Sequence, residues 1–159
     1  MLSMILMKFF RFSRCNSFHT FVRVKITTMM TAQLKHYESK LAFETDPSDL
    51  FEAMNNGEKI IPVDARRPSA FAKEHIPGAI NIPHRTMNPE NTRTLRKDVL
   101  YVTYCDGIGC NASTKGALKL TSLGFKVKEL IGGIEWWKLD GYSTDGSHGV
   151  LGVKVKCAC

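Results

Sequence analysis

Residues 101–111 read YVTYCDGIGCN, in which an apolar, β-rich run ends at Cys105 and a loop with two glycines follows. A helical pattern then covers residues 112–123. The order strand, short loop, helix lets a loop turn its backbone N–H groups inward to form an anion cradle. Because such groups and the helix dipole favour an anion, we expect Cys105 to be a nucleophile whose thiol pKa is lowered. The residues expected to bind the substrate through this loop are Asp106, Gly107, Ile108, Gly109, Cys110 and Asn111.

Strand and helix patterns alternate along the rest of the chain. The strands are expected at residues 40–44, 60–63, 79–82, 99–104 and 127–130, with the first at a sheet edge. The helices are expected at 46–56, 68–73, 112–123 and 134–139, with one further turn inside the polar connection 84–96. Asp46 is the expected N-cap of the first helix, and Asn111 that of the helix at 112–123. The inward face of the latter helix is expected to carry Ala117, Leu118 and Thr121, with Leu120 nearby. This alternation predicts an α/β fold with a mostly parallel sheet. Ligands bind such sheets beyond the carboxyl ends of the strands, where Cys105 lies.

Three separated motifs resemble the rhodanese-like domain family. They are Val-Asp-Ala-Arg at 63–66 with His-Ile-Pro-Gly-Ala-Ile-Asn-Ile-Pro at 75–83, Tyr-Cys at 104–105 with its glycine loop, and Leu-Gly-Phe at 123–125 with Leu-Ile-Gly-Gly-Ile-Glu-Trp-Trp at 130–137. The resemblance implies a single rhodanese-like domain with three α/β/α layers around a five-stranded, mostly parallel sheet. It also implies a sulfurtransferase, in which Cys105 takes a sulfane sulfur from a donor, becomes a persulfide and passes the sulfur to a thiol or cyanide. The implied partners are a small sulfane-sulfur donor or a persulfidated protein, and a thiol acceptor.

Several residues depart from the family pattern or support it. The loop is about two residues longer than the usual sulfurtransferase loop, and a wider loop marks the related phosphatases. Those enzymes carry an arginine in the loop, and this loop has none, which argues against a phosphate substrate. The carboxylate of Asp106 should repel thiosulfate and act to raise the pKa of Cys105, so a persulfide is expected as donor at least as much as thiosulfate. Asp64 and Arg66 are expected to form a buried ion pair that braces the loop, and Glu74, in place of a usual glycine, is expected to change only the local backbone.

Other cysteines leave alternatives open. Cys110 either attacks a persulfide on Cys105 or is a small residue without chemistry at the helix start. The alternative function is therefore a thiol redox or partner-binding module that uses the Cys105/Cys110 pair. Cys157 and Cys159 either receive sulfur on a flexible arm or are incidental. Four thiols raise the question of zinc, but the spacings C-x₄-C and C-x-C fit zinc patterns poorly, so neither a metal nor a cofactor is expected.

Charge and composition limit the class of protein. The chain has 159 residues and a net charge of +7, and residues 1–30 carry five basic and no acidic residues. Subtracting that +5 leaves +2 for the remainder, which does not suggest a nucleic-acid partner. No apolar run is long enough to span a membrane, and five cysteines, an odd number, do not form a secreted disulfide framework.

The expected division of the chain has three parts. Residues 1–32 form a basic, disordered extension, which is either a targeting segment or spurious; residues 33–145 form the domain; residues 146–159 form a flexible tail that contains cysteines. The expected location is cytoplasmic, or mitochondrial if residues 1–30 are a presequence. The oligomeric state is left open.

Overall fold

The computed structural model describes residues 16–153, with side chains from residue 28 onward. The chain divides into two units, Met1–Glu38 and Ser39–Cys159. Helix α1 covers Asn16–Phe43, so the extension is helical from Asn16 where disorder was expected, and residues 1–15 lie outside the described residues. The edge strand expected at 40–44 is also wrong, because the helix continues through Lys-Leu-Ala, all strong helix formers. No helix in the described part of the chain is long and apolar enough to cross a membrane.

The sheet of the second unit has five strands in the order β1-β5-β4-β2-β3, and every neighbouring pair is parallel. The strands are β1 (Glu44–Thr45), β2 (Ile60–Asp64), β3 (Ile80–Asn81), β4 (Leu100–Tyr104) and β5 (Lys126–Leu130). The predicted α/β class and five-stranded sheet are therefore confirmed, and the ends of β2, β3, β4 and β5 lie within one residue of the predicted ones. The strand β4, which ends immediately before Cys105, is the central one.

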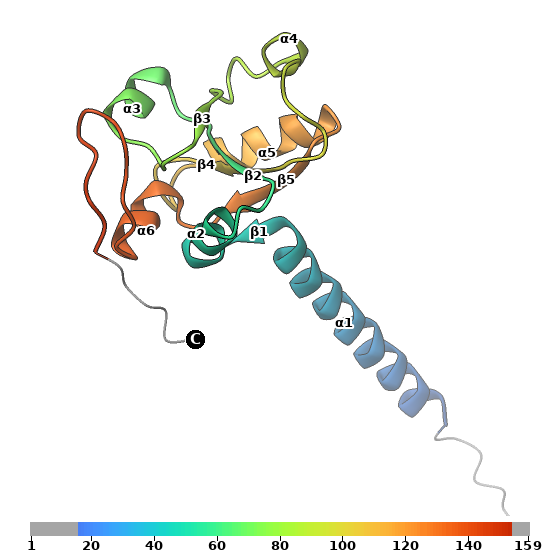
Figure 1. The fold of residues 1–159 in the computed structure, drawn as a ribbon. Helices are drawn as coiled ribbons and strands as arrows, with labels where there is room; N and C mark the ends of the chain where they lie inside the picture. Colours follow the sequence, from blue (N-terminus) through green and yellow to red (C-terminus); the bar gives the residue numbers. More distant parts are fainter. Residues whose placement is uncertain (1–15, 154–159) are drawn as a thin grey trace, which may run out of the picture. The chain divides into compact units, whose positions relative to one another are not determined.

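Helices cover both faces of this sheet and make three layers (Figure 1). The helices α2 (Pro47–Asn55) and α6 (Gly133–Leu139) pack on one face, with Leu50 and Trp137 buried against Val102 and Tyr104. The helix α5 (Ala112–Ser122) packs on the other face through Leu120. Successive residues of β4 point to opposite faces, so one short strand contributes to both cores.

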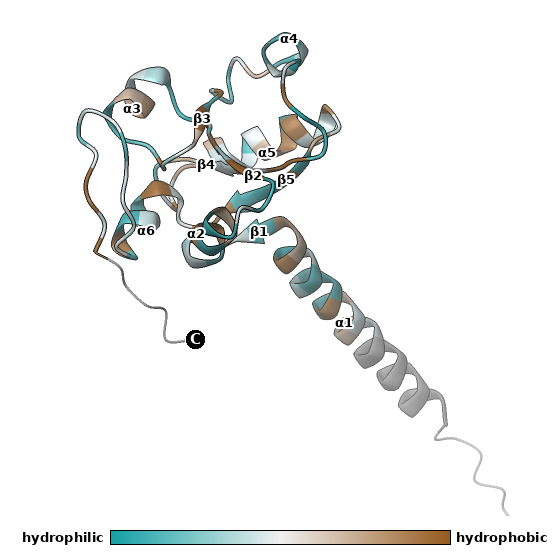
Figure 2. Ribbon diagram, viewed as in Figure 1, coloured by the Kyte–Doolittle hydropathy of each residue, from teal (hydrophilic) through white to brown (hydrophobic). Residues whose placement is uncertain are grey.

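Two short helices complete the second unit. Helix α3 covers Pro68–Lys73, as predicted, and α4 (Pro89–Thr92) is the single turn expected in the connection at 84–96, which is mainly hydrophilic (Figure 2). The two tryptophans divide between core and surface, since Trp137 is buried and Trp136 is 41 % exposed.

The helix ends agree with the sequence in one case and differ in another. The Asp46 carboxylate caps α2 by accepting from the Asp49 N–H at 2.9 Å. The side chain of Asn111, in contrast, makes no capping hydrogen bond at the start of α5. The predicted inward face of α5 is wrong for Leu118, which is 71 % exposed, and for Thr121, which is also exposed, whereas Leu120 is buried together with Gly116. A Cβ at Gly116 would lie 3.3 Å from the Cβ of Ala65, so this glycine allows the helix to lie close to the sheet.

The segment that follows α6 is held against the domain, where a flexible tail was expected from residue 146. His75 and Asp145 exchange two backbone hydrogen bonds of 2.9 Å, and the Ser147 and His148 N–H groups donate to carbonyl oxygens of α3. The ring of Tyr142 stacks on Phe51 at 4.4 Å. We call residues 142–150 the C-terminal strap. Cys157 and Cys159 lie outside the described residues.

Candidate active site

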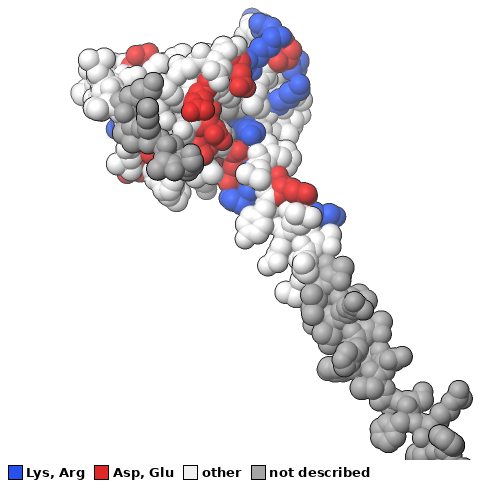
Figure 3. Space-filling model, turned by 60° about the horizontal axis from the view of Figure 1, so that its bottom comes forward, with Lys and Arg blue, Asp and Glu red and all other residues white. Residues whose placement is uncertain are grey.

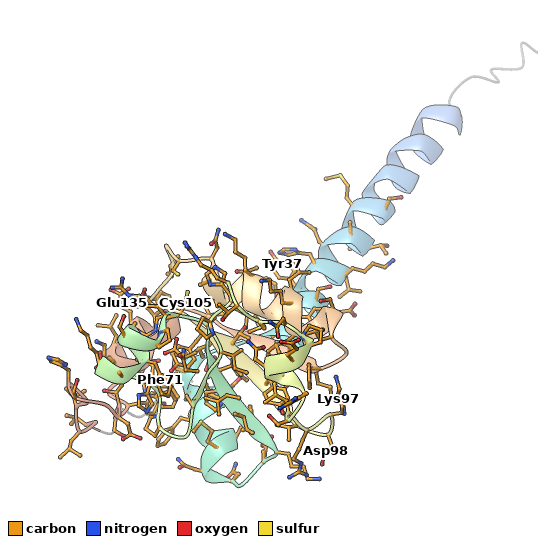
Figure 4. All side chains as sticks on the ribbon, turned by 90° about the horizontal axis from the view of Figure 1, so that it is seen from above. Tyr37, Phe71, Lys97, Asp98, Cys105 and Glu135 are labelled. Atoms are coloured by element: carbon orange, nitrogen blue, oxygen red, sulfur yellow. The ribbon has the colours of Figure 1, made fainter. Side chains whose placement is uncertain are left out.

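Cys105 lies at the carboxyl end of β4, where it lines a cavity of about 250 Å³. Figure 4 shows it beside Glu135 at one end of the domain, with Lys97 and Asp98 at the opposite end. The first residues of α5 and the Gly132–Gly133 turn form further walls of the cavity. The position agrees with the general location of ligands in parallel α/β sheets.

The thiol of Cys105 faces three oxygen atoms. Its Sγ lies 2.9 Å from the carbonyl oxygen of Cys110, 3.7 Å from that of Gly107 and 3.3 Å from the Ser113 hydroxyl. Burial raises the pKa of Cys105, and hydrogen bonding with the side chain and backbone of Ser113 offsets only part of that effect. The expectation of a lowered pKa is therefore wrong. The physical reason is that the thiol, only 2 % exposed, loses more hydration than the helix N-terminus restores.

Helix α6 holds the start of the loop. The Ile134 N–H donates to the carbonyl oxygen of Cys105 at 3.0 Å, and the Glu135 N–H donates to that of Asp106 at 2.9 Å. These are N–H groups at a helix start, which have no partner within their own helix. Gly133 precedes them at φ +59°, and a Cβ there would collide with the Cys105 carbonyl oxygen. A glycine is thus required for α6 to approach the loop this closely.

A buried guanidinium braces the loop from the other side. Arg66 donates from Nε and Nη2 to the carboxylate of Asp64, with a shortest distance of 2.6 Å, and from Nη1 to Asp106 at 3.0 Å. Its Nη2 also donates to the backbone oxygen of Glu74 at 2.7 Å. The expected buried pair is confirmed, since Asp64 is fully buried and the Arg66 side chain is 8 % exposed. Asp106 is directed toward Arg66, so its charge is partly balanced.

The cavity brings together some of the predicted loop residues and not others. Gly107, Ile108, Cys110 and Asn111 line it, whereas Asp106 and Gly109 do not. Cys110 packs in the same small cluster as Cys105, and both are free thiols. The charged residues among the described lining are Glu44 and Glu129, which are both acidic.

Sequence reasoning missed the residues contributed by the neighbouring strands and by α5. The Ser113 hydroxyl donates to Glu129 Oε1 at 2.7 Å, and the Thr114 hydroxyl donates to the same oxygen at 2.8 Å. Glu44 lies beside Glu129 because β1 pairs with β5 in that register. One signal was present in the sequence, because Glu129 is an acidic residue at the carboxyl end of a predicted strand, where ligands bind.

Glu74 has a larger role than the expected local change of backbone. Its carboxylate accepts from Thr144 of the strap at 2.9 Å and from Lys138 of α6 at 2.8 Å. Burial acts to raise the pKa of this carboxyl, but the two hydrogen bonds outweigh burial and lower the pKa. The residue therefore links the arginine brace, α6 and the strap.

Comparisons with known proteins point to one family. The sequence model of the rhodanese-like domain family matches residues 46–140 of this chain. The crystal structure of the BH2092 protein from Bacillus halodurans is 44 % identical, with a TM-score of 0.72, and the match covers 75 % of this chain and 88 % of that one. A rhodanese-related protein from Thermoplasma volcanium is 26 % identical, with a TM-score of 0.57 over 65 % of this chain and 97 % of that one. A thiosulfate sulfurtransferase from Pseudomonas aeruginosa is also 26 % identical, with a TM-score of 0.56 over 69 % of this chain and 20 % of that one. No curated protein sequence matches the chain.

Proposed function

This chain belongs to the rhodanese-like domain family, and on that premise we propose that it is a sulfurtransferase that carries sulfane sulfur as a persulfide on Cys105. The observation that carries the proposal is the position of this thiol. It lies at the carboxyl end of the central strand, in the wall of a cavity and next to the first turn of α5. A nucleophile in that position lines the cavity on one side and is held by the loop on the other.

The charges around the cavity favour a persulfide as the donor over thiosulfate. Glu44, which is paired with Lys40, and Glu129 are the charged residues among its described lining, so a dianion entering the cavity meets the negative charge of Glu129. Arg66 does not compensate, because its donors are engaged by Asp64, Asp106 and the Glu74 carbonyl. On the face drawn in Figure 3, acidic side chains lie across the domain with basic side chains beside them. We therefore propose a small-thiol or protein persulfide as the physiological donor.

The reaction consists of two displacements. The Cys105 thiolate attacks the outer sulfur of the donor R–S–SH, the donor S–S bond breaks, and RS⁻ leaves with the bonding electron pair. The new Cys105–S–SH group then loses its outer sulfur to an acceptor thiolate, which regenerates the Cys105 thiolate. No net oxidation occurs, because each step exchanges one S–S bond for another.

Mass spectrometry tests this proposal. The reduced chain is incubated with cysteine persulfide or with thiosulfate, and the peptide that contains Cys105 should gain about 32 Da, the mass of one sulfur atom, more rapidly with the persulfide. Cys105→Ser should abolish that adduct and the transfer of sulfur to an added thiol. A chain that gains no sulfur at Cys105 from either donor would contradict the proposal.

A second candidate function uses Cys110, which packs beside Cys105 because the loop turns back through a Cys110 N–H to Gly107 O hydrogen bond of 3.0 Å. In this scheme the Cys110 thiolate attacks the inner sulfur of the Cys105 persulfide, HS⁻ leaves, and a Cys105–Cys110 disulfide forms that a thiol must reduce. Cys110→Ser separates the two schemes. It should retain the sulfur adduct in both, and it should abolish sulfide release only in the disulfide scheme.

A further inference from the structure

A chain of hydrogen bonds leads from Cys105 to a carboxylate in the cavity wall. The thiol lies 3.3 Å from the Ser113 hydroxyl, which is 2.7 Å from Glu129 Oε1. Cys105 and Ser113 are 2 % and 3 % exposed, so water has little access to either group, whereas Glu129 is only half-buried and lines the cavity. The chain of contacts therefore connects a buried acid to a solvent-accessible base.

The chemistry of the three oxygens around the thiol determines along which hydrogen bonds a proton can move away from Cys105. The carbonyl oxygens of Gly107 and Cys110 can accept the thiol proton, but they have no proton to pass on. The Ser113 hydroxyl both accepts and donates, and its single proton is directed at Glu129. Among these contacts, Ser113 is thus the one group that can receive the thiol proton while it releases its own.

We propose that Ser113 and Glu129 form the proton path of Cys105, with Glu129 as the positioned acceptor that acts through the serine hydroxyl. As the sulfur forms its new bond, the thiol proton moves to Ser113 Oγ and the hydroxyl proton moves to Glu129 Oε1. Glu129 then releases the proton to water in the cavity. The inference rests on the proposed function only in taking Cys105 as the nucleophile.

The groups that face Glu129 are compatible with this role. From α5 they are Ser113 and Thr114, and the Thr114 hydroxyl keeps the carboxylate in place by donating to the same oxygen. From β1 the adjacent Glu44 is paired with Lys40 at 2.5 Å, and from β4 the register partner is the uncharged Thr103. Across the loop stand the two thiols of Cys105 and Cys110.

The pH dependence of Cys105 alkylation tests the proposal without any sulfur donor. Iodoacetamide is neutral, and its rate of reaction at the Cys105 peptide can be followed by mass spectrometry. With a general base, the rate should be nearly constant between about pH 6 and 8, because the base is already ionised there. In Glu129→Gln, which keeps a hydrogen-bond acceptor but not a base, the rate should rise about tenfold per pH unit. The variant should be about 10- to 100-fold slower at pH 7 and should approach the parent rate in alkaline solution.

Two further variants make the test specific. Ser113→Ala should reproduce the pH profile of Glu129→Gln. The alkylation rate of the double variant should be no lower than that of either single variant, because both changes interrupt the same proton path. Glu90→Gln removes an exposed carboxylate on α4, which contributes no residue to the cavity, and should leave the flat profile unchanged. The proposal is overturned if Glu129→Gln keeps the parent rate and slope, or if it reacts faster. A faster reaction would mean that Glu129 withholds the hydroxyl proton of Ser113 from the Cys105 thiolate.

Thermal unfolding of each variant verifies that it is folded. The alkylation profiles need no sulfur donor, so they would be unaffected if the chain failed to transfer sulfur.

Discussion

At the scale of single residues, the arginine brace depends on buried charge. The guanidinium of Arg66 is engaged on both sides, by the fully buried Asp64 and by the exposed Asp106 of the loop. Its pKa is raised because these partners outweigh the cost of burial, so it stays charged at every accessible pH. Such a residue fixes loop geometry in a way that an exposed ion pair does not.

Arg66→Leu should therefore lower the free energy of unfolding by about 3–5 kcal/mol, since it leaves the Asp64 carboxylate buried without its partner. Urea denaturation measures this loss. Arg96→Leu is the matched control, because Arg96 pairs with Asp98 on the surface and its removal should change stability little. Equal losses in the two variants would contradict the argument.

The raised pKa of Cys105 predicts how stability changes in alkaline solution. The folded chain holds the thiol proton more tightly than the unfolded chain, whose thiol pKa is about 8.5. The resulting stabilisation is present below that pH and is lost as the pH rises through the folded pKa, by at most about 1.4 kcal/mol per unit. Urea titrations under reducing conditions should thus show a steeper alkaline decline for the parent than for Cys105→Ser. Parallel declines would show that the thiol pKa is not raised.

At the scale of elements, the Gly132–Gly133 turn determines how α6 meets the loop. We expect Gly133→Ala to lower stability by about 1–3 kcal/mol, because alanine is strained at φ +59° and its methyl group meets the Cys105 carbonyl oxygen. The variant should also alter the alkylation rate of Cys105, since the loop must move. Gly109→Ala is the control in the same loop, where a Cβ has no neighbour within 4 Å. If both variants behave alike, close contact with α6 does not hold the loop.

The elements also show which structure the sequence could predict. Local signals were sufficient where they were strong, as for the Asp46 cap and for Gly57, which ends α2 at φ +72°. They failed at Leu118, because the side of α5 that faces the sheet is decided by a close approach at Gly116 and not by hydrophobicity alone. They also failed for residues 40–43, whose helical propensity prevailed over a short apolar pattern.

The residues of the candidate site also fall into those that the sequence could predict and those that it could not. The proposed nucleophile and its loop are contiguous in sequence, so the pattern from strand to helix was enough to propose them. The Ser113–Glu129 contact joins residues on two elements, and only the pairing of the sheet and the packing of α5 bring them together. The thiol pKa was mispredicted because sequence reports the helix N-terminus but not the depth of burial.

At the scale of the whole molecule, the matched family region ends at residue 140, but the packed structure does not. Tyr142 is 7 % exposed and belongs to the core of Leu50 and Trp137, and Thr144 donates to Glu74. The strap thereby connects α3 to α6 through Glu74, whose backbone oxygen accepts from the arginine brace. We infer that the strap supports the loop of Cys105 from a distance.

Two truncations test this inference. Removing residues 142–159 should lower the free energy of unfolding by at least about 3 kcal/mol, the order observed when a buried aromatic side chain is lost. Removing only 154–159 leaves the strap intact and should change stability little, although it also deletes Cys157 and Cys159.

The longer truncation should also make the free energy of unfolding depend less on pH in acid solution. The lowered pKa of the Glu74 carboxyl stabilises the fold above about pH 4.3, and this stabilisation is lost as the pH falls through the folded pKa. Without the Thr144 hydroxyl the pKa of Glu74 is lowered less, so the stabilisation is smaller. Equal stability of the two truncated chains, measured in urea from acid to neutral pH, would mean that the fold ends where the family match does.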